Sequence, residues 1–410
     1  TITSGEGGPY TLTRGNNFTQ QQDSARSTYN PAMIEVCSTS GPGTASLTLT
    51  NIILDDAGKQ SGDNPNSTED PNYFIQADSE GDGKTVFGEL AISNTDIVQD
   101  AMIATYNGVG TITLGDGAIL KNYGGMSAVR LSSGTLIMES GSVICDDTVT
   151  DRVKGTTIPG AKTSYYGPAG AIWMQGGELI MEEDSKISNI VGRAIYNESG
   201  NAELNGLIEG TKVDVDMWWG SYENGHETVN GFIMHMRSNA TAVLGAAAVI
   251  DNDRITAYGS GIAVLGGCKL TMDNGAVVTG FDNGNVFDIG GTAFLNGEIT
   301  GLTGGSHAIV AQSSSNHYIR IGETANIHDN ICNYGVIYTQ GSNGVIDIYG
   351  KINDNISTDR GGALTVANNG THVEVNMYDG AEMCNNVSYQ TGGGVMVSCG
   401  TFTMYGGIIS

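Results

Sequence analysis

The stretch K-L-T-M-D-N-G-A-V-V-T-G, residues 269 to 280, decides the fold. It contains a short run in which apolar and polar residues alternate, a turn at Asn274 and Gly275, and a second short apolar run. Alternation with a period of two is typical of a strand that buries one face. Two short strands joined by a glycine turn are therefore the unit to seek in the rest of the chain.

The same pattern recurs with a period of about 23 to 28 residues, which is the length of one coil of a solenoid. Clear copies are T-L-I-M-E-S-G-S-V-I-C-D-D (135 to 147), T-A-F-L-N-G-E-I-T-G (292 to 301), V-I-D-I-Y-G-K-I-N-D-N (345 to 355) and V-E-V-N-M-Y-D-G-A-E-M-C-N-N (373 to 386). A third apolar run completes each copy, as in G-A-I-W-M (170 to 174) and G-A-L-T-V (362 to 366). Three short strands per coil predict an all-β fold, a right-handed parallel β-helix with long loop insertions.

One inward-facing column can be written directly from the aligned copies. A buried parallel sheet needs apolar residues at alternate positions. The residues that meet this need in one column are Met138, Met181, Met272, Leu295, Ile348, Met377 and Met404.

The domain organisation follows from where the copies are clear. We expect residues 1–109 to supply N-terminal strands and polar loops that lead into the solenoid, and residues 110–410 to form its coils. Insertions at 146–167 and 210–230 are long, and long loops on a rigid scaffold are common places for function. The last residues, Y-G-G-I-I-S, lie within a coil, so we expect an open C-terminal end that a second chain or a further domain covers.

Composition excludes several classes of partner. The 410 residues contain 18 Lys and Arg against 44 Asp and Glu, a net charge of -26. Such a chain repels phosphate backbones, so nucleic acid is excluded as a partner. No apolar run approaches the roughly 20 residues of a membrane-spanning helix, so no membrane span is expected. A neutral oligosaccharide is compatible with this charge.

Acidic groups suited to a metal ion are few. Asp146, Asp147 and Asp151 form one set of oxygen ligands that suits Ca2+, and Asp251 and Asp253 form another. Small groups of this kind are expected by chance in so acidic a chain. The histidines show no metal-ligand spacing. We therefore predict neither a metal ion nor a cofactor.

Asp347 and Asp354 are the candidate catalytic pair. They flank the short turn I-Y-G-K-I, and in the outward column of Asp347 the neighbours are Arg320 and Asn376. A neighbouring arginine favours the ionised carboxylate. Two carboxyl groups about 5 to 5.5 Å apart serve a retaining glycosidase, and about 6.5 to 9.5 Å an inverting one. The alternative is that Asp354 belongs to a ladder of Asp and Asn residues that cap the turns of successive coils.

Other side chains are predicted to bind substrate alongside Arg320 and Asn376. His328 lies one coil before Asn353 and is placed to bind a sugar hydroxyl. Aromatic rings combine an apolar face with a polar tip and suit sugar rings. The aromatic candidates are Trp173 and Tyr338 on third strands, and Trp218 and Trp219 in the 210–230 insertion.

A family resemblance extends this interpretation. The pattern G-G-G-V-M-V-S-C-G-T-F-T-M-Y-G-G-I-I-S, residues 392 to 410, resembles the repeat of secreted parallel β-helix proteins from gut-type bacteria. Within that group, the spacing of Asp347 and Asp354, seven residues apart, is similar to that in the lacto-N-biosidase family of β-helix glycoside hydrolases. The resemblance implies a retaining mechanism, with Asp347 as general acid/base and Asp354 as nucleophile. It also implies that folding often needs a helical domain or partner chain.

Three functions are consistent with these features. The first is a secreted bacterial glycoside hydrolase that acts on neutral oligosaccharides. The second is a non-catalytic surface adhesin or carbohydrate-binding β-helix. The third, a polysaccharide lyase, is the weakest, because so few basic residues are available to neutralise uronate carboxylates.

Overall fold

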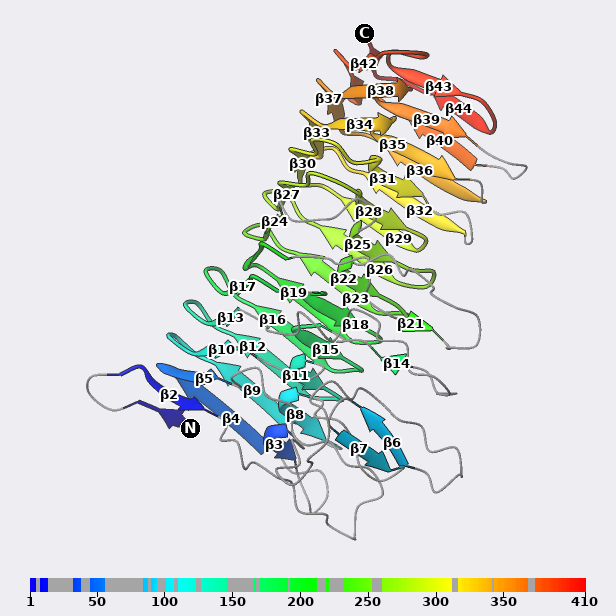
Figure 1. The fold of residues 1–410 in the computed structure, drawn as a ribbon. Helices are drawn as coiled ribbons and strands as arrows, with labels where there is room; N and C mark the ends of the chain where they lie inside the picture. The colour runs from blue at the N-terminus through cyan, green and yellow to red at the C-terminus, as the bar shows by residue number, and fades with distance from the viewer. Residues whose placement is uncertain are drawn as a thin grey trace.

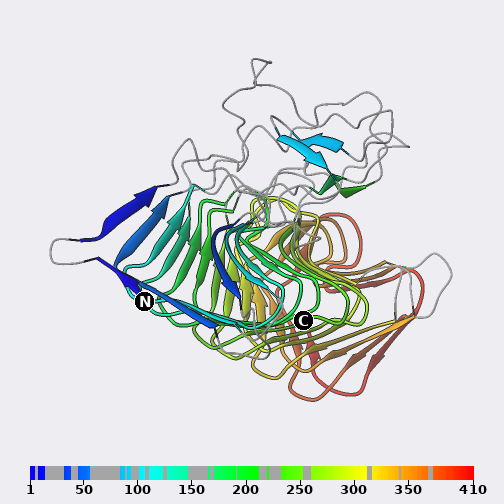
Figure 2. The ribbon, with the colours of Figure 1, turned by 90° about the horizontal axis from the view of Figure 1, so that it is seen from below.

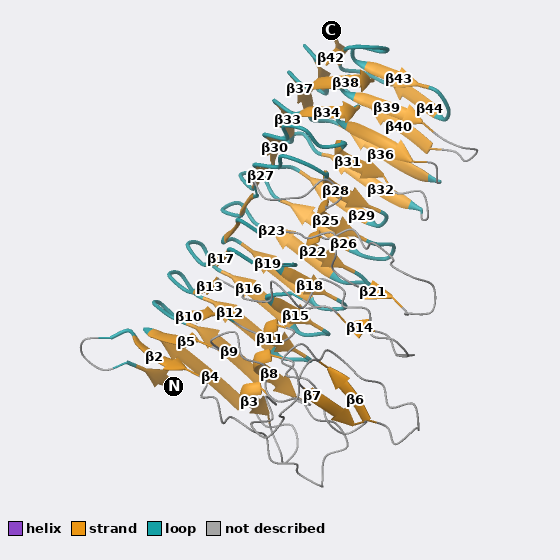
Figure 3. Cartoon of the chain, viewed as in Figure 1, coloured by secondary structure: helices purple, strands orange, loops and turns teal. Residues whose placement is uncertain are grey.

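A computed structural model places most of the chain in a solenoid of short strands (Figure 1). The description below covers residues 1–4, 8–13, 32–37, 45–55, 84–87, 90–93, 101–106, 110–122, 127–145, 165–166, 170–190, 192–211, 219–220, 232–252, 260–311, 316–340, 343–367 and 373–410. Within these ranges the chain consists of strands and the loops and turns that join them (Figure 3). Figure 2 shows the strands of each sheet one behind another, wound about a common axis.

Sheet A is parallel and has 13 strands among the described residues. In spatial order they are β1 (Ile2–Thr3), β4 (Ala45–Thr50), β9 (Gly110–Leu114), β12 (Thr135–Met138), β16 (Glu178–Met181), β19 (Asn201–Leu204), β23 (Thr241–Leu244), β26 (Lys269–Met272), β29 (Thr292–Leu295), β32 (His317–Ile321), β36 (Gly344–Ile348), β40 (Val373–Met377) and β44 (Thr401–Met404).

Sheet B follows sheet A along the chain and also has 13 described parallel strands. They are β2 (Tyr10–Thr13), β5 (Ile52–Asp55), β10 (Ile119–Lys121), β13 (Val143–Cys145), β17 (Lys186–Ser188), β20 (Leu207–Glu209), β24 (Val249–Asp251), β27 (Val277–Thr279), β30 (Glu298–Thr300), β33 (Asn326–His328), β37 (Lys351–Asn353), β41 (Glu382–Met383) and β45 (Ile408–Ile409).

Sheet C completes each coil with 12 described parallel strands. They are β3 (Ala32–Cys37), β8 (Ala101–Tyr106), β11 (Ser127–Leu131), β15 (Ile172–Met174), β18 (Ile195–Asn197), β22 (Phe232–Met236), β25 (Ser260–Val264), β28 (Asn285–Ile289), β31 (His307–Ala311), β35 (Ile337–Gln340), β39 (Leu364–Ala367) and β43 (Val395–Val397).

Three smaller sheets accompany the solenoid. Sheet H is parallel and inserts a fourth strand between sheets B and C in the late coils, namely β34 (Ile331–Tyr334), β38 (Ile356–Arg360) and β42 (Val387–Ser388). Two antiparallel pairs are β6 (Lys84–Phe87) with β7 (Leu90–Ser93), and β14 (Tyr165–Tyr166) with β21 (Trp219–Gly220). The fourth strand was not foreseen from the sequence.

The parallel β-helix fold is confirmed, and so is the register behind it. Met138 pairs with Met181, and Ile348 pairs with Met377, which in turn pairs with Met404. The inward column is fully buried except in the last strand, where Met404 is 47% exposed. Because stacked apolar columns bury the same positions in every coil, hydrophobic burial drives the winding. Strands of residues 1–55 already join sheets A, B and C, so stacking begins well before residue 110.

The rigid coils leave two kinds of outer surface. Outward side chains of sheet A are mostly half-buried, whereas those of sheet C are often fully buried, as at Tyr196 and Ala263. Among the described residues, no helix has the length and apolar character needed to cross a membrane.

Candidate functional site

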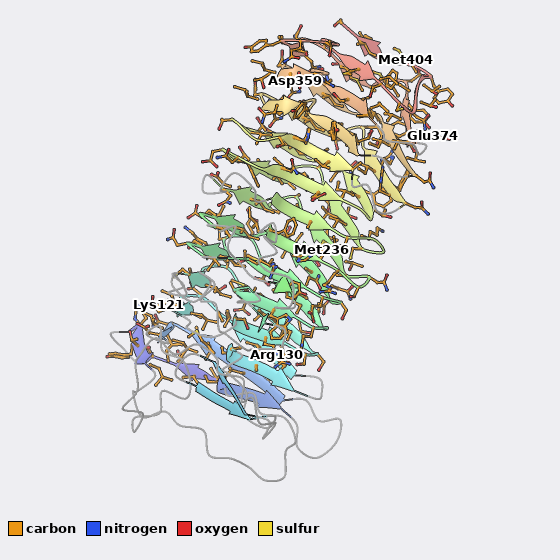
Figure 4. All side chains as sticks on the ribbon, turned by 45° about the vertical axis from the view of Figure 1, so that its right-hand side comes forward. Lys121, Arg130, Met236, Asp359, Glu374 and Met404 are labelled. Carbon is orange, nitrogen blue, oxygen red and sulfur yellow. The ribbon has the colours of Figure 1, made fainter. Side chains whose placement is uncertain are left out.

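Asp347 lies on the outer face of sheet A, in strand β36. Its strand neighbours are Arg320 on β32 and Asn376 on β40, as the alignment of the repeats predicted. Its side chain is half-buried. Figure 4 shows the side chains of these late coils. Glu374, which is labelled there, shares strand β40 with Asn376 and is exposed.

Three neutral donors hold the carboxylate of Asp347. Asn376 Nδ2 and the Tyr378 hydroxyl donate to Oδ1 at 3.1 and 3.3 Å, and the Tyr318 hydroxyl donates to Oδ2 at 2.9 Å. A carboxylate offers about four lone-pair positions, so Oδ2 keeps acceptor capacity for a further donor. Bonds to an ionised acceptor are the strong kind, and they fix the orientation of the group. Asp347 is therefore a preorganised acceptor at the surface.

Arg320 lies beside Asp347 but directs its guanidinium elsewhere. Its Nη2 donates to Glu323 Oε1 at 2.7 Å, and its Cζ lies 4.6 Å from the ring centroid of Tyr349. An added Cβ at Gly322 would lie 1.8 Å from Asn296 Oδ1 and 3.3 Å from Arg320 Nη1, so the glycine leaves room chiefly for Asn296. Arg320 thus covers one face of an aromatic ring instead of pairing with the aspartate.

Tyr349 begins a stack of three tyrosines that sequence reasoning missed. Tyr349 and Tyr378 have ring centroids 4.4 Å apart at an interplanar angle of 4°, and Tyr378 and Tyr405 follow at 5.4 Å and 18°. The signal is present in the repeats I-D-I-Y, V-N-M-Y and F-T-M-Y, which each place tyrosine directly after the sheet A strand. Stacked rings of this kind add about 0.5 to 1.5 kcal/mol per pair beyond burial.

The phenols around Asp347 are electrostatically coupled to it. Burial and the hydrogen bond to the Asp347 carboxylate raise the pKa of Tyr318. Partial burial and the negative charge of Asp347 raise the pKa of Tyr378 to about 12. Both hydroxyls therefore stay protonated at neutral pH and remain donors. We call Asp347, Asn376, Tyr318, Tyr349 and Tyr378, with Arg320, the Asp347 cluster.

Asp354 lies in a different setting, at the turn that follows strand β37 of sheet B. Its φ of 57° is in the left-handed region, as are those of Asp329 (52°) and Asn385 (56°) at the same turn of the adjacent coils. Asn385 Nδ2 donates to Asp354 Oδ1 at 3.0 Å. Asp and Asn adopt this backbone conformation more readily than most residues. The turn ladder that the sequence offered as the alternative is thus present.

A second ladder of buried asparagines runs beside it. Asn330 Nδ2 donates to Asn355 Oδ1, and Asn355 Nδ2 donates to Asn386 Oδ1, both at 3.0 Å. Each of the first two amides also bonds a backbone carbonyl two residues earlier, at 2.9 Å. Asn330 and Asn355 are fully buried. These bonds hold the turns of neighbouring coils together, with Asp354 on their outer side.

The two aspartates therefore belong to different sheets. The hydrogen-bond partners of Asp347 lie on sheet A or on the turn after it, and the partner of Asp354 lies on the sheet B turn of the next coil. They share no partner among the described residues. The arrangement presents one preorganised carboxylate within an aromatic cluster and one carboxylate in a turn.

His328 is one coil before Asn353, as predicted, but it is engaged by two carboxylates. Its Nδ1 lies 2.7 Å from Asp329 Oδ2, and its Nε2 lies 3.0 Å from Glu298 Oε1. Burial alone would lower the pKa of His328, but the two carboxylates outweigh it and the pKa is raised. His328 thus forms a bridge on the outer side of sheet B.

The aromatic candidates of sheet C have separate environments. Trp173 pairs with Tyr196 in register and lies under the Arg130 guanidinium, 4.8 Å from Cζ to the ring centroid. Tyr338 stacks on His307 at 4.4 Å and 13°. Trp218 lies outside the described residues, and Trp219 is placed only by its backbone in β21. None of the described sheet C aromatics joins the Asp347 cluster.

In the part of the chain that the structure describes, no group of three or more His, Cys, Asp or Glu side chains is arranged so that it could hold a metal ion. The Asp251 side chain lies on β24, and Asp146, Asp147, Asp151 and Asp253 lie outside the described residues.

Comparison with known proteins adds little. No family model matches the chain, and no curated protein matches it significantly. Among solved structures, a TibC-catalysed hyper-glycosylated fragment of TibA is similar, with 10% identity, coverage of 91% of this chain and 98% of that chain, and a TM-score of 0.24. A likeness at this level carries no argument about activity.

Proposed function

We propose that this chain is the carbohydrate-binding β-helix of a secreted or cell-surface bacterial protein, and that the Asp347 cluster binds a neutral oligosaccharide. The observation that carries the proposal is the preorganised Asp347 carboxylate among half-buried tyrosines on sheet A and the turns after it. Sugar sites combine aromatic rings with a few planar polar groups that fix orientation. The cluster supplies both on a face that remains accessible.

The charge of the chain favours a neutral ligand. An anionic glycan would meet a net charge of -26 and a carboxylate at the centre of the cluster. A sugar hydroxyl would instead donate to the remaining lone pair of Asp347 Oδ2. Arg320 and the neighbouring rings cover the faces of Tyr349 and Tyr378, so the sugar would contact the edges of these half-buried rings.

The test is binding of neutral oligosaccharides by the full chain, screened on a glycan array and measured by calorimetry. We expect Asp347→Asn to weaken the best ligand about tenfold to a hundredfold, because a bond to a charged acceptor contributes about 1.5 to 3 kcal/mol. The matched control is Glu374→Gln, which removes an exposed carboxylate from the same sheet outside the cluster. Equal affinities for wild type and Asp347→Asn would refute the site.

A second candidate function is glycoside hydrolysis of the lacto-N-biosidase kind, with Asp347 as general acid/base and Asp354 as nucleophile. It is favoured by the fixed orientation of the Asp347 carboxylate, because catalytic groups act best when their neighbours hold them. The test is hydrolysis of a chromogenic β-lacto-N-bioside by wild type, Asp347→Asn and Asp354→Asn. Turnover that both substitutions abolish without unfolding would support an enzyme. Binding without turnover would support the adhesin-like function.

A further inference from the structure

A second polar and aromatic cluster lies on the outer side of sheet C, away from Asp347. His307, at the start of β31, is 6% exposed and stacks on Tyr338 of the next coil. The ring of Tyr334 lies 6.0 Å from His307 and 6.4 Å from Tyr338, and Tyr334 is 43% exposed. Asn285 pairs with His307 in register one coil earlier.

The hydrogen bonds of His307 define which ring nitrogen carries the proton. Nδ1 contacts the carbonyl oxygens of Tyr334 and Gly335, the latter at 3.1 Å. Carbonyl oxygens only accept, so Nδ1 is the donor, and Nε2 of the neutral ring is an acceptor. Burial outweighs these bonds and lowers the pKa of His307 to about 4, so the ring stays neutral at ordinary pH. No described residue donates to Nε2.

A second acceptor without a partner lies alongside. Asn285 Oδ1 is buried and makes no hydrogen bond with any residue that the structure describes. An unpaired buried acceptor costs about 1 to 3 kcal/mol, so it calls for an occupant that can donate. Asn285 and His307 occupy paired positions on neighbouring strands, which lie about 4.8 Å apart. The two residues are therefore close enough for one occupant with two neighbouring donors to reach both.

We infer that Asn285, His307, Tyr334 and Tyr338 form a second sugar-binding site, which takes a neutral saccharide through two adjacent hydroxyls. The hydroxyls donate to Asn285 Oδ1 and His307 Nε2, and the exposed ring of Tyr334 supplies an apolar wall for the sugar C–H face. The site is independent of Asp347, which lies on sheet A. A chain with two such sites engages a multivalent glycan surface more strongly than either site alone.

The test reads His307 directly. Protein labelled with 15N at histidine is titrated with methyl α-mannoside, methyl β-galactoside and methyl β-glucoside, which present differently arranged adjacent hydroxyls. Long-range 15N–1H spectra first establish that Nδ1 is protonated. We then expect at least one glycoside to shift the Nε2 resonance of His307 saturably, while the ring of His328, bonded at both nitrogens, does not shift with it.

Variants separate a site from a non-specific effect. Asn285→Ala and Tyr334→Ala should each weaken the effective glycoside by roughly threefold to tenfold, the value of one hydrogen bond or one aromatic contact. Tyr389→Ala is the matched control, because Tyr389 is 68% exposed and lies outside the cluster, and it should leave binding unchanged.

Three results would overturn the inference. The first is a His307 ring protonated at Nε2. The second is an Nε2 resonance that no glycoside moves, which would mean that ordered water satisfies the two acceptors. The third is a shift that persists unaltered in Asn285→Ala and Tyr334→Ala.

Discussion

Replacing Asn355 by alanine should weaken the solenoid far more than its small size suggests. The Asn355 amide is buried between two coils and links the turn of Asp354 to the coils on either side. Its Nδ2 donates to the carbonyls of Ile327 and Asn353, both at 2.9 Å, and to Asn386. Its Oδ1 accepts from the backbone N–H of Asn330 at 3.1 Å.

The expected loss can be added up from these bonds. Removing both amide protons of Asn355 forfeits two net hydrogen bonds, about 2 kcal/mol. Removing Oδ1 leaves the buried backbone N–H of Asn330 without an acceptor, which costs about 1 to 3 kcal/mol. The Asn330 side chain keeps its bonds to Ile299 and His328 and adds nothing to the loss. Asn355→Ala should therefore lower the free energy of unfolding by about 3 to 5 kcal/mol.

Urea denaturation followed by circular dichroism measures this loss, and hydrogen exchange at the Asn330 amide localises it. The matched control is Asn333→Ala, because Asn333 is exposed and its side chain accepts one bond, from Thr358 at 3.2 Å. The control should change stability by no more than about 0.5 kcal/mol. A loss below about 1 kcal/mol for Asn355→Ala, or unchanged exchange at Asn330, would refute the claim that the ladder holds the coils together.

Further predictions concern the backbone, a charged bridge and the ligand. Gly134→Ala should lower the free energy of unfolding by at least about 2 kcal/mol more than Gly380→Ala, as measured by urea denaturation. Both glycines have positive φ, but of the two only Gly134 would place a Cβ 2.0 Å from a backbone oxygen, and equal losses would contradict this packing. His328 has a raised pKa, so its contribution to stability is fully present below its unfolded pKa of about 6.5 and is lost as pH rises through the folded value. His328→Gln should remove that component from the pH dependence of the free energy of unfolding, and an unchanged pH dependence would refute the bridge. Tyr378→Phe keeps the ring but removes its bond to Asp347, so affinity for the neutral oligosaccharide should fall by roughly twofold to tenfold in calorimetry, and no change would mean that Asp347 needs no such support.

The fold could be predicted because its signals repeat. A position that faces inward in one coil faces inward in the next. The apolar column through Met138 and Met377 therefore indicates the inward face of sheet A in many coils. The order Arg320, Asp347, Asn376 followed from the same alignment. The register of the parallel strands is set by the pattern of apolar residues, so it can be predicted by aligning the repeats.

The contacts of the site could be predicted only in part. Neighbours in a column do not determine where a long side chain points, and the guanidinium of Arg320 goes to Glu323 and Tyr349. The donors to Asp347 from Tyr318 and Tyr378 come from other columns and reach it diagonally. Such reach depends on rotamers, which the repeat pattern does not encode.

The stacked asparagines have a consequence for how such a chain changes length. Each rung bonds to the same position one coil later, so an inserted copy of a whole coil meets suitable partners above and below it. A single residue gained within a strand would instead turn every later side chain of that strand to the opposite face. Gain and loss of entire repeats is therefore the tolerated mode of variation, and it lengthens or shortens the outer surface without redesigning the interior.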